Sequence, residues 1–212
     1  MKDFADVRAW IFDLDNTLYP PEADLFSQIE PRMTDWVMRA LGVDRAAADT
    51  LRDQYWERYG TTLAGLMAEH DLDPVPYLTD VHDILLDHLV PDATLAARIA
   101  ALPGRRVVFT NGSAPYAERV LRARGLDHVF HAVYGVEHAG YRSKPERVAF
   151  DTVIALDGIA AERAAMFEDM SRNLIAPHEM GMRTILVSPL PETAPHIHYH
   201  TDDLSDFLSR LP

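Results

Sequence analysis

Two aspartates, Asp13 and Asp15, follow the apolar run 10–12 at the point where a strand is expected to end. Because side chains alternate along a strand, an extended backbone would present both carboxylates on the same side. Two negative charges that close together must be neutralised, or one of them must take up a proton. A divalent cation with oxygen ligands provides the first, and a general acid/base role for one carboxylate uses the second. The pair therefore predicts metal-assisted carboxylate chemistry.

Three further polar clusters follow apolar segments later in the chain. They are Thr110-Asn111-Gly112, Lys144 before Pro145, and Glu168-Asp169 followed by Asn173. In an open parallel sheet, ligands bind beyond the carboxyl ends of the strands, so we expect these clusters to converge on the aspartates. A carboxylate nucleophile, a hydroxyl and amide site, a lysine and an acidic pair together suit phosphoryl transfer with bound Mg²⁺. Each cluster alone has a simpler explanation as a turn, a solvated loop or a helix cap, and their order favours the site.

The elements that position these clusters alternate between strand and helix. Strands are expected at residues 7–13, 105–110, 130–136, 164–168 and 184–187, and helices at 115–124, 145–156 and 172–181. This alternation predicts a doubly wound (Rossmann-like) parallel α/β sheet with right-handed crossovers. Residues 21–91 instead show helical periodicity, which continues through the last run 81–89, and they lack a convincing strand pattern. We expect an α/β core made of residues 1–20 and 92–212, with an inserted all-α cap at 21–91 formed by about four helices.

Composition limits the possible partners. The 212 residues suffice for one core with a small second unit, and no apolar stretch is long enough for a membrane span. The chain has no cysteine, and its start lacks the features of a signal peptide, so we expect a soluble cytoplasmic protein that is a monomer or homodimer. The formal net charge of −13 disfavours nucleic-acid polymers and anionic membranes. A phosphorylated substrate would therefore need a local cation site.

The ordered motifs DLDNT, TNG, KP and EDMSRN resemble the four motifs of the haloacid dehalogenase (HAD) superfamily, over essentially the whole chain. The helical insertion resembles the α-helical cap that one subfamily carries after the first motif. The resemblance implies that Asp13 is a nucleophile that forms an aspartyl-phosphate and that Asp15 is the general acid/base. It also implies a phosphoryl-binding site at Thr110, Asn111 and Gly112.

The same resemblance implies the cation and its setting. Lys144 would offset charge on the nucleophile and the phosphate, and Mg²⁺ would be held by Asp13, the Asp15 backbone carbonyl and Asp169. Glu168 would bind the metal directly or through water. Two further residues would have supporting roles, namely Thr17 and Asn173, the second beside Lys144 or the acidic loop.

The second aspartate, Asp15, also favours a phosphatase, because the dehalogenases of the superfamily lack an acid there. A finer resemblance, carried by residues 59–66, Asn16 and residues 81–83, is to the pyrimidine 5′-nucleotidase branch, whose implied substrates are nucleoside monophosphates such as UMP and CMP. In that reading Thr61 and Thr62 contact the leaving group, and His82 faces the same cleft. The alternatives are a phosphatase or phosphotransferase on small sugar phosphates and a non-catalytic protein that binds a phosphate ligand, with a dehalogenase least favoured.

Two other patterns are better explained without a ligand. His196, His198 and His200 alternate like metal ligands on a strand, but a short late strand with exposed histidines explains them as well, since only Asp202 and Asp203 are near as supporting acids. The aromatic residues at helical spacing, which include Trp56, favour packing over a platform for base stacking.

Overall fold

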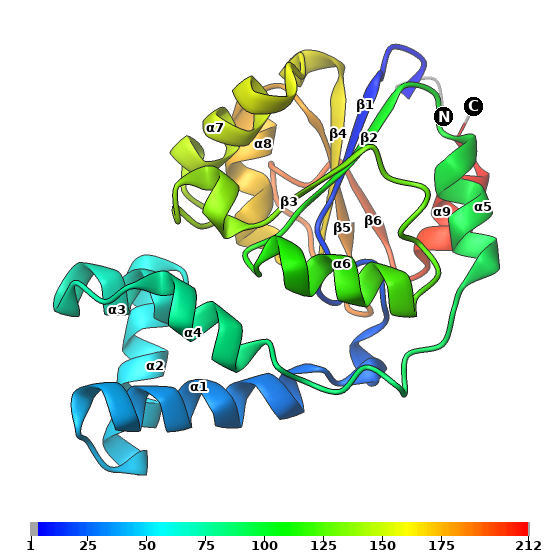
Figure 1. Cartoon of the computed structure of the whole chain (residues 1–212). Coiled ribbons are helices and arrows are strands. Elements are labelled where there is room, and N and C mark those ends of the chain that lie inside the picture. The colour runs from blue at the N-terminus through cyan, green and yellow to red at the C-terminus, as the bar shows by residue number, and fades with distance from the viewer. Residues whose placement is uncertain (1–3, 212) are drawn as a thin grey trace.

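The computed structural model of the chain describes residues 4–211, and residues 1–3 and 212 of the expected core lie outside them. Its centre is a parallel sheet with the strand order β3-β2-β1-β4-β5-β6, which confirms the doubly wound α/β fold (Figure 1). The strands are β1 (Ala9–Phe12), β2 (Arg105–Phe109), β3 (Ala132–Tyr134), β4 (Ala164–Glu168), β5 (Arg183–Val187) and β6 (Tyr199–Thr201). Strand β1 lies between β2 and β4 and is buried along its whole length, as expected for a strand covered on both faces.

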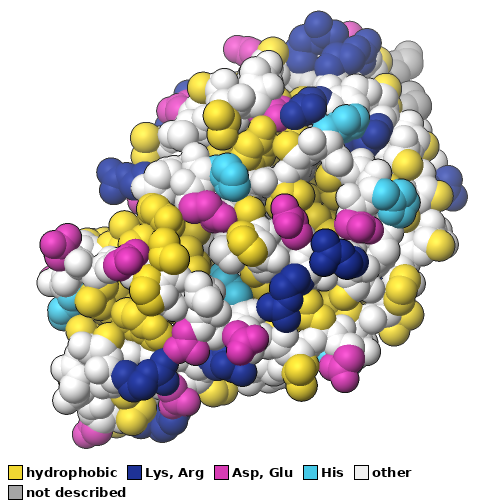
Figure 2. Space-filling view, in the orientation of Figure 1, with side chains coloured by type: hydrophobic (Ala, Val, Ile, Leu, Met, Phe, Trp, Pro, Cys, Tyr) yellow, Lys and Arg dark blue, Asp and Glu magenta, His cyan; other side chains and the backbone are white. Residues whose placement is uncertain are grey.

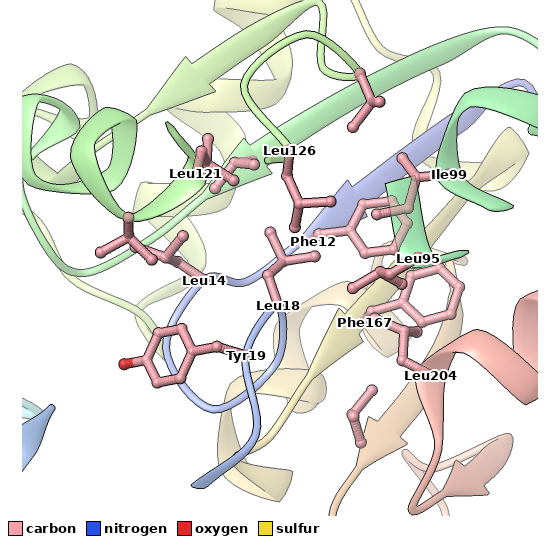
Figure 3. Close-up of a cluster of buried hydrophobic side chains, with 14 of the residues drawn as sticks. Phe12, Leu14, Leu18, Tyr19, Leu95, Ile99, Leu121, Leu126, Phe167 and Leu204 are labelled. Carbon is pink, nitrogen blue, oxygen red and sulfur yellow. The ribbon is translucent and has the colours of Figure 1, made fainter. Parts of the chain in front are cut away.

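Helices cover both faces of the sheet. One face packs against α5 (Ala93–Ala101), α6 (Ala114–Ala123) and α9 (Leu204–Ser209), and the other against α7 (Arg147–Asp157) and α8 (Ile175–Glu179). Because side chains alternate along β1, Phe12 enters the first cluster, drawn in Figure 3, whereas Ile11 enters the second. The two apolar layers fix β1 and so the position of the polar residues that follow it.

The segment between β1 and α5 contains the four helices that the periodicity predicts. They are α1 (Phe26–Leu41), α2 (Arg45–Tyr59), α3 (Thr62–His70) and α4 (Pro74–Val81), and a short 3₁₀ helix, η2 (Pro21–Ala23), precedes them. These helices share a separate buried cluster that includes Val37, Tyr55 and Leu66. Figure 1 shows them side by side below the carboxyl ends of the strands. We call α1–α4 the helical cap, and its boundaries as a domain stay a prediction.

The expected continuation of the fourth helix through Leu89 is wrong. Helix α4 ends at Val81, and residues 82–92 form an irregular linker back to the core. Ile84 and Leu89 are buried in the first core cluster, so their spacing reflects anchoring of the linker instead of a helical stripe. Arg119 of α6 donates hydrogen bonds to the carbonyls of His82 (3.0 Å) and Ile84 (2.7 Å), which holds this backbone in its non-helical path.

Some later elements also differ from the expected ones. The helix expected at 172–181 is a 3₁₀ turn, η5 (Ser171–Leu174), followed by the short α8, and two further 3₁₀ turns are η3 (Val136–Ala139) and η4 (Ala161–Arg163). Helices α5 and α9 were not expected.

On the face drawn in Figure 2, Lys and Arg side chains lie among Asp and Glu side chains. None of the described helices has the length and hydrophobicity needed to cross a membrane.

Candidate active site

The polar residues predicted to converge lie together at the carboxyl ends of the three central strands. Asp13 follows β1, Thr110 follows β2 and Glu168 ends β4, and these strands are neighbours in the sheet. A cavity of about 240 Å³ lies there, between the strand ends and the helical cap. Asp13 and Asp15 both line this cavity, although β1 ends at Phe12 and Asp15 lies in the turn after it, so the expected strand alternation does not extend to Asp15.

Lys144 is the cation at the centre of the site and is almost completely buried. Its Nζ donates hydrogen bonds to Asp13 Oδ1 (2.6 Å), Glu168 Oε1 (2.8 Å) and the Phe109 carbonyl (3.0 Å). Asn111 holds the backbone of this lysine, because its Nδ2 donates to the Lys144 carbonyl (3.0 Å) and its Oδ1 accepts from the Lys144 N–H (2.8 Å). The side-chain amide of Asn111 is thus used to place Lys144, and its expected contact with a phosphoryl group stays a prediction.

The pKa shifts show that the site holds more negative charge than one lysine balances. Burial, and then the charge of Glu168, raise the pKa of Asp13 to about 8 against the opposing effect of Lys144. Burial, followed by the charges of Glu168 and Asp13, raises the pKa of Asp169 to about 10. Burial acts to lower the pKa of Lys144, but the carboxylates of Asp13 and Glu168 outweigh it and the pKa lies above its ordinary value. A further positive charge would stabilise the ionised carboxylates.

The acidic residues fit a hard divalent cation such as Mg²⁺. One carboxylate oxygen each from Asp13, Glu168 and Asp169 lie within 4.8 Å of one another, and no other such group is found in residues 4–211. Glu168 is already heavily used, since its Oε1 accepts from Lys144 and from Asn173 Nδ2 (2.6 Å) and its Oε2 accepts from the Met170 N–H (3.0 Å). Asp13 and Asp169 are therefore the better candidates for direct ligands. Asn173 lies beside Glu168, one of the two places expected for it.

The remaining motif residues support this arrangement. Thr17 Oγ1 donates a long hydrogen bond of 3.4 Å to Asp13 Oδ2. Thr110 Oγ1 accepts from the Gly112 N–H (2.9 Å), which orders the turn after β2, and both residues line the cavity. Burial raises the pKa of Asp15, against the opposing hydrogen bonds from Tyr19 and Tyr116.

The turn between α2 and α3 brings the cap against the core beside Lys144. Gly60 has a positive φ of 86°, and a Cβ there would lie 3.3 Å from Pro145 Cδ, so the turn approaches residues 143–145 closely. Thr61 caps α3, because its Oγ1 accepts from the Ala64 N–H (3.1 Å). Thr61 and Thr62 both line the cavity, and their contact with a substrate stays a prediction.

Sequence reasoning missed Arg172, whose side chain packs against Trp56. The Arg172 guanidinium lies 3.9 Å over the Trp56 ring and donates a 3.1 Å hydrogen bond to the Gly60 carbonyl, so it joins the core to the cap. Both residues line the cavity, and Arg172 Nε is buried without a hydrogen-bond partner. The position of Arg172 inside the last motif was the available signal, but the sequence does not show that its side chain reaches the cap.

The histidines divide into two groups. His196 Nε2 lies 2.9 Å from Ser171 Oγ, His198 Nδ1 lies 2.7 Å from Thr184 Oγ1, and His200 Nε2 lies 2.8 Å from the Ser188 carbonyl, so each histidine has a partner of its own. The expected strand is shorter than this pattern, because β6 begins at Tyr199 and contains only His200. His82 lines the cavity, as the finer resemblance implies. Its Nδ1 lies 3.2 Å from Ser113 Oγ, and burial lowers its pKa to about 4.

Comparisons with known proteins agree with this geometry. A family model described as haloacid dehalogenase-like hydrolase matches residues 7–181. Phosphate metabolism protein 8 of Saccharomyces cerevisiae is 25% identical over 198 residues, which cover 84% of this chain but only 61% of that protein. A 5′-nucleotidase of Pseudomonas aeruginosa is 24% identical over 199 residues, covering 82% of this chain and 80% of the relative. The crystal structure of CbbY from Rhodobacter sphaeroides in complex with phosphate matches with a TM-score of 0.65 at 20% identity, covering 95% of this chain and 96% of that one, which shows a shared fold.

Proposed function

The chain belongs to the haloacid dehalogenase-like hydrolase family, and on that premise we propose that it hydrolyses phosphate monoesters through a covalent intermediate on Asp13. The observation that carries the proposal is the contact between Lys144 Nζ and Asp13 Oδ1 at the wall of the cavity. A buried lysine beside a buried carboxylate lowers the pKa of that carboxylate below the value that burial alone would give, and it reduces the repulsion between the carboxylate and an anionic phosphate. The presence of Asp15 favours an ester whose leaving group needs a proton.

The reaction has two balanced steps. A carboxylate oxygen of Asp13 attacks phosphorus, the bond from phosphorus to the leaving oxygen breaks, and Asp15 gives that oxygen its proton. A water molecule then attacks phosphorus and passes a proton to Asp15, which releases inorganic phosphate and restores the Asp13 carboxylate. Asp15 finishes each cycle in the protonation state in which it began.

We assign Mg²⁺ to the acidic group at the strand ends. Asp13 and Asp169 would hold it through carboxylate oxygens, and the backbone carbonyl of Asp15 would add a ligand, with Glu168 binding directly or through water. When bound, Mg²⁺ supplies positive charge for the phosphoryl oxygens. Support comes from the three carboxylate oxygens that lie within 4.8 Å of one another, in a site where burial and neighbouring carboxylates raise the pKa values of Asp13 and Asp169.

For the substrate, we propose nucleoside 5′-monophosphates, with pyrimidine ones preferred. Trp56 and the Arg172 guanidinium stacked on its ring supply a planar surface at the cavity, and the unpaired Nε of Arg172 offers a donor to an acceptor on the leaving group. A planar base with carbonyl groups has both matching features. The Pseudomonas relative named a 5′-nucleotidase also supports the proposal. Small sugar phosphates are the second candidate, because the carboxylate and lysine machinery does not select the leaving group.

The test is phosphate release from a panel of nucleoside monophosphates and sugar phosphates, with Mg²⁺ and with EDTA. We expect Mg²⁺-dependent release that is fastest with UMP or CMP and absent from the Asp13→Asn variant. If phosphate is released fastest from sugar phosphates, the proposed substrate class is wrong and the proposed phosphatase reaction stands. No release from any ester would refute the phosphatase and favour a non-catalytic phosphate-binding protein. A cytoplasmic location and a monomeric or homodimeric state belong to the same proposal.

A further inference from the structure

Two tyrosines bind the same oxygen of Asp15, and the mechanism above gives neither of them a role. Tyr19 donates its hydroxyl to Asp15 Oδ1 at 2.6 Å, and Tyr116 donates its hydroxyl to the same atom at 2.8 Å. Tyr19 lies four residues beyond Asp15, whereas Tyr116 comes from α6, a hundred residues later in the chain. Both tyrosines are almost completely buried. Burying two phenol donors against one oxygen is a specific arrangement that ordinary packing does not require.

The two bonds distinguish the oxygens of the Asp15 carboxyl group. Oδ1 has two lone pairs, and the two hydroxyls occupy both of them. A proton that arrived at Oδ1 would have to displace one of these hydrogen bonds. Oδ2 is therefore the oxygen that carries the acid/base proton, in a site where Asp15 lines the cavity and neither tyrosine does.

We propose that Tyr19 and Tyr116 are positioning residues that hold Asp15 so that its proton is always carried on Oδ2, facing the leaving group. The inference rests on the proposed function, because it needs Asp15 to act as general acid and base. With Oδ1 fixed from behind, rotation of the carboxyl group is prevented in both protonation states. The proton is then delivered to the leaving oxygen from one direction, and accepted from water at the same atom.

The rings of both tyrosines are held in place, as a positioning role requires. In Figure 3 the Tyr19 ring lies at the margin of the buried apolar cluster beside Leu18, and its hydroxyl points out of the cluster. The Tyr116 ring stacks on His82 of the cap linker, with ring centroids 4.3 Å apart and planes 8° from parallel. A Cβ on Gly112 would lie 3.0 Å from Tyr116 Cδ1, so a glycine in the phosphate-side turn allows this ring to approach.

The test compares leaving groups in Tyr19→Phe and Tyr116→Phe, which keep each ring and delete only the hydroxyl. A nucleoside 5′-monophosphate needs its leaving oxygen protonated, whereas p-nitrophenyl phosphate releases a stable phenolate. We expect kcat for the nucleotide to fall roughly tenfold in each variant, as for loss of a hydrogen bond to a charged group. Formation of the phosphoenzyme from p-nitrophenyl phosphate should change less than twofold, and its slowed hydrolysis should appear as a burst of about one p-nitrophenolate per enzyme.

The matched control is Tyr134→Phe, which deletes a partly buried hydroxyl that donates to Asp157 at 2.6 Å on the other face of the sheet. It should show neither the split between substrates nor the burst. Equal losses on both substrates without a burst would overturn the inference, as would tyrosine variants that match the control. Thermal unfolding checks that each variant is folded, and either tyrosine variant decides the question alone if the other is unstable. If the wild-type protein releases phosphate from no ester, the proposed function fails instead, which separates the two failures.

Discussion

Replacing Lys144 with methionine tests the charge balance on which the active site depends. Methionine keeps most of the length of the side chain but removes the Nζ that bonds Asp13, Glu168 and the Phe109 carbonyl. Two buried carboxylates would then lose their cation, and removing one partner of a buried ion pair costs about 3–5 kcal/mol. Since domains of this kind have a total stability of about 5–15 kcal/mol, the variant should keep a folded state with much reduced stability.

The assay is thermal unfolding at pH 8 in EDTA, where we expect the melting temperature to fall by roughly 6–20 °C. The loss should depend on pH. Because the pKa of Asp13 is raised in the folded state, its stabilising effect is complete below its ordinary value of 3.8 and is lost as the pH rises toward about 8. Without Lys144 that pKa rises further, so the deficit at pH 8 should exceed the deficit at pH 5.

The control for this prediction is Arg147→Met. It removes the Arg147 Nε that lies 3.0 Å from Asp151 Oδ1, in an ion pair whose two side chains are half exposed. Exposed pairs contribute at most about 1 kcal/mol, so this variant should melt close to the wild type. Mg²⁺ should recover part of the Lys144→Met loss, because it returns positive charge to the same carboxylates. A Lys144→Met protein that melts with the wild type in EDTA at pH 8 would refute the argument that this lysine balances the buried acids.

Three further predictions address the metal, the leaving group and the linker. Asp169→Asn should raise the Mg²⁺ concentration needed for half-maximal activity at least tenfold, and an unchanged metal titration would remove Asp169 from the metal site. Arg172→Met should raise KM for the preferred nucleotide roughly tenfold while changing activity on p-nitrophenyl phosphate less than twofold, and equal changes on both would show a purely structural role. The pKa of His82 is lowered by burial to about 4, so its stabilising contribution is present above its ordinary pKa of 6.5 and is lost as the pH falls toward 4. As the pH falls from 6.5 to 4, the free energy of unfolding should therefore decrease by up to about 3 kcal/mol less in the His82→Phe variant than in the wild type. Urea unfolding measures this free energy at each pH, and an equal pH dependence in the two proteins would contradict the prediction.

The sequence predicts which polar residues meet at the carboxyl edge of the sheet, because a small number of physical constraints determine their positions. Apolar runs locate the strands, and the polar residues that end them must meet at one edge of a parallel sheet. Asp13, Thr110 and Glu168 are brought together for this reason alone. The sequence does not show which hydrogen bonds these polar residues make, such as the two by which Asn111 holds the backbone of Lys144. Such pairings depend on loop paths that have no periodic signal.

The cap was harder to predict because its surfaces depend on contacts between distant segments. Ile84 and Leu89 have helical spacing, yet burial against the core and the bonds from Arg119 make their segment a linker. Trp56 lies on a helix whose spacing indicates packing, but it also lines the cavity, and Arg172 reaches its ring from the core. The short elements β6 and α9 carry too few residues to give a clear pattern.

This difference between core and cap has a consequence for how the enzyme selects its substrate. In the proposed function, the nucleophile, the lysine and the acidic group all come from the core, where they act on the phosphate that every candidate ester shares. We propose that the leaving group instead meets the cap, and Arg172 is a cavity-lining core residue that contacts cap residues, through Trp56 and the Gly60 carbonyl. Substitutions in this contact should therefore change which ester is chosen, whereas substitutions around Lys144 should change whether any ester is cleaved. A variant of Arg172 that lost activity equally on all esters would show that this contact does not select the leaving group.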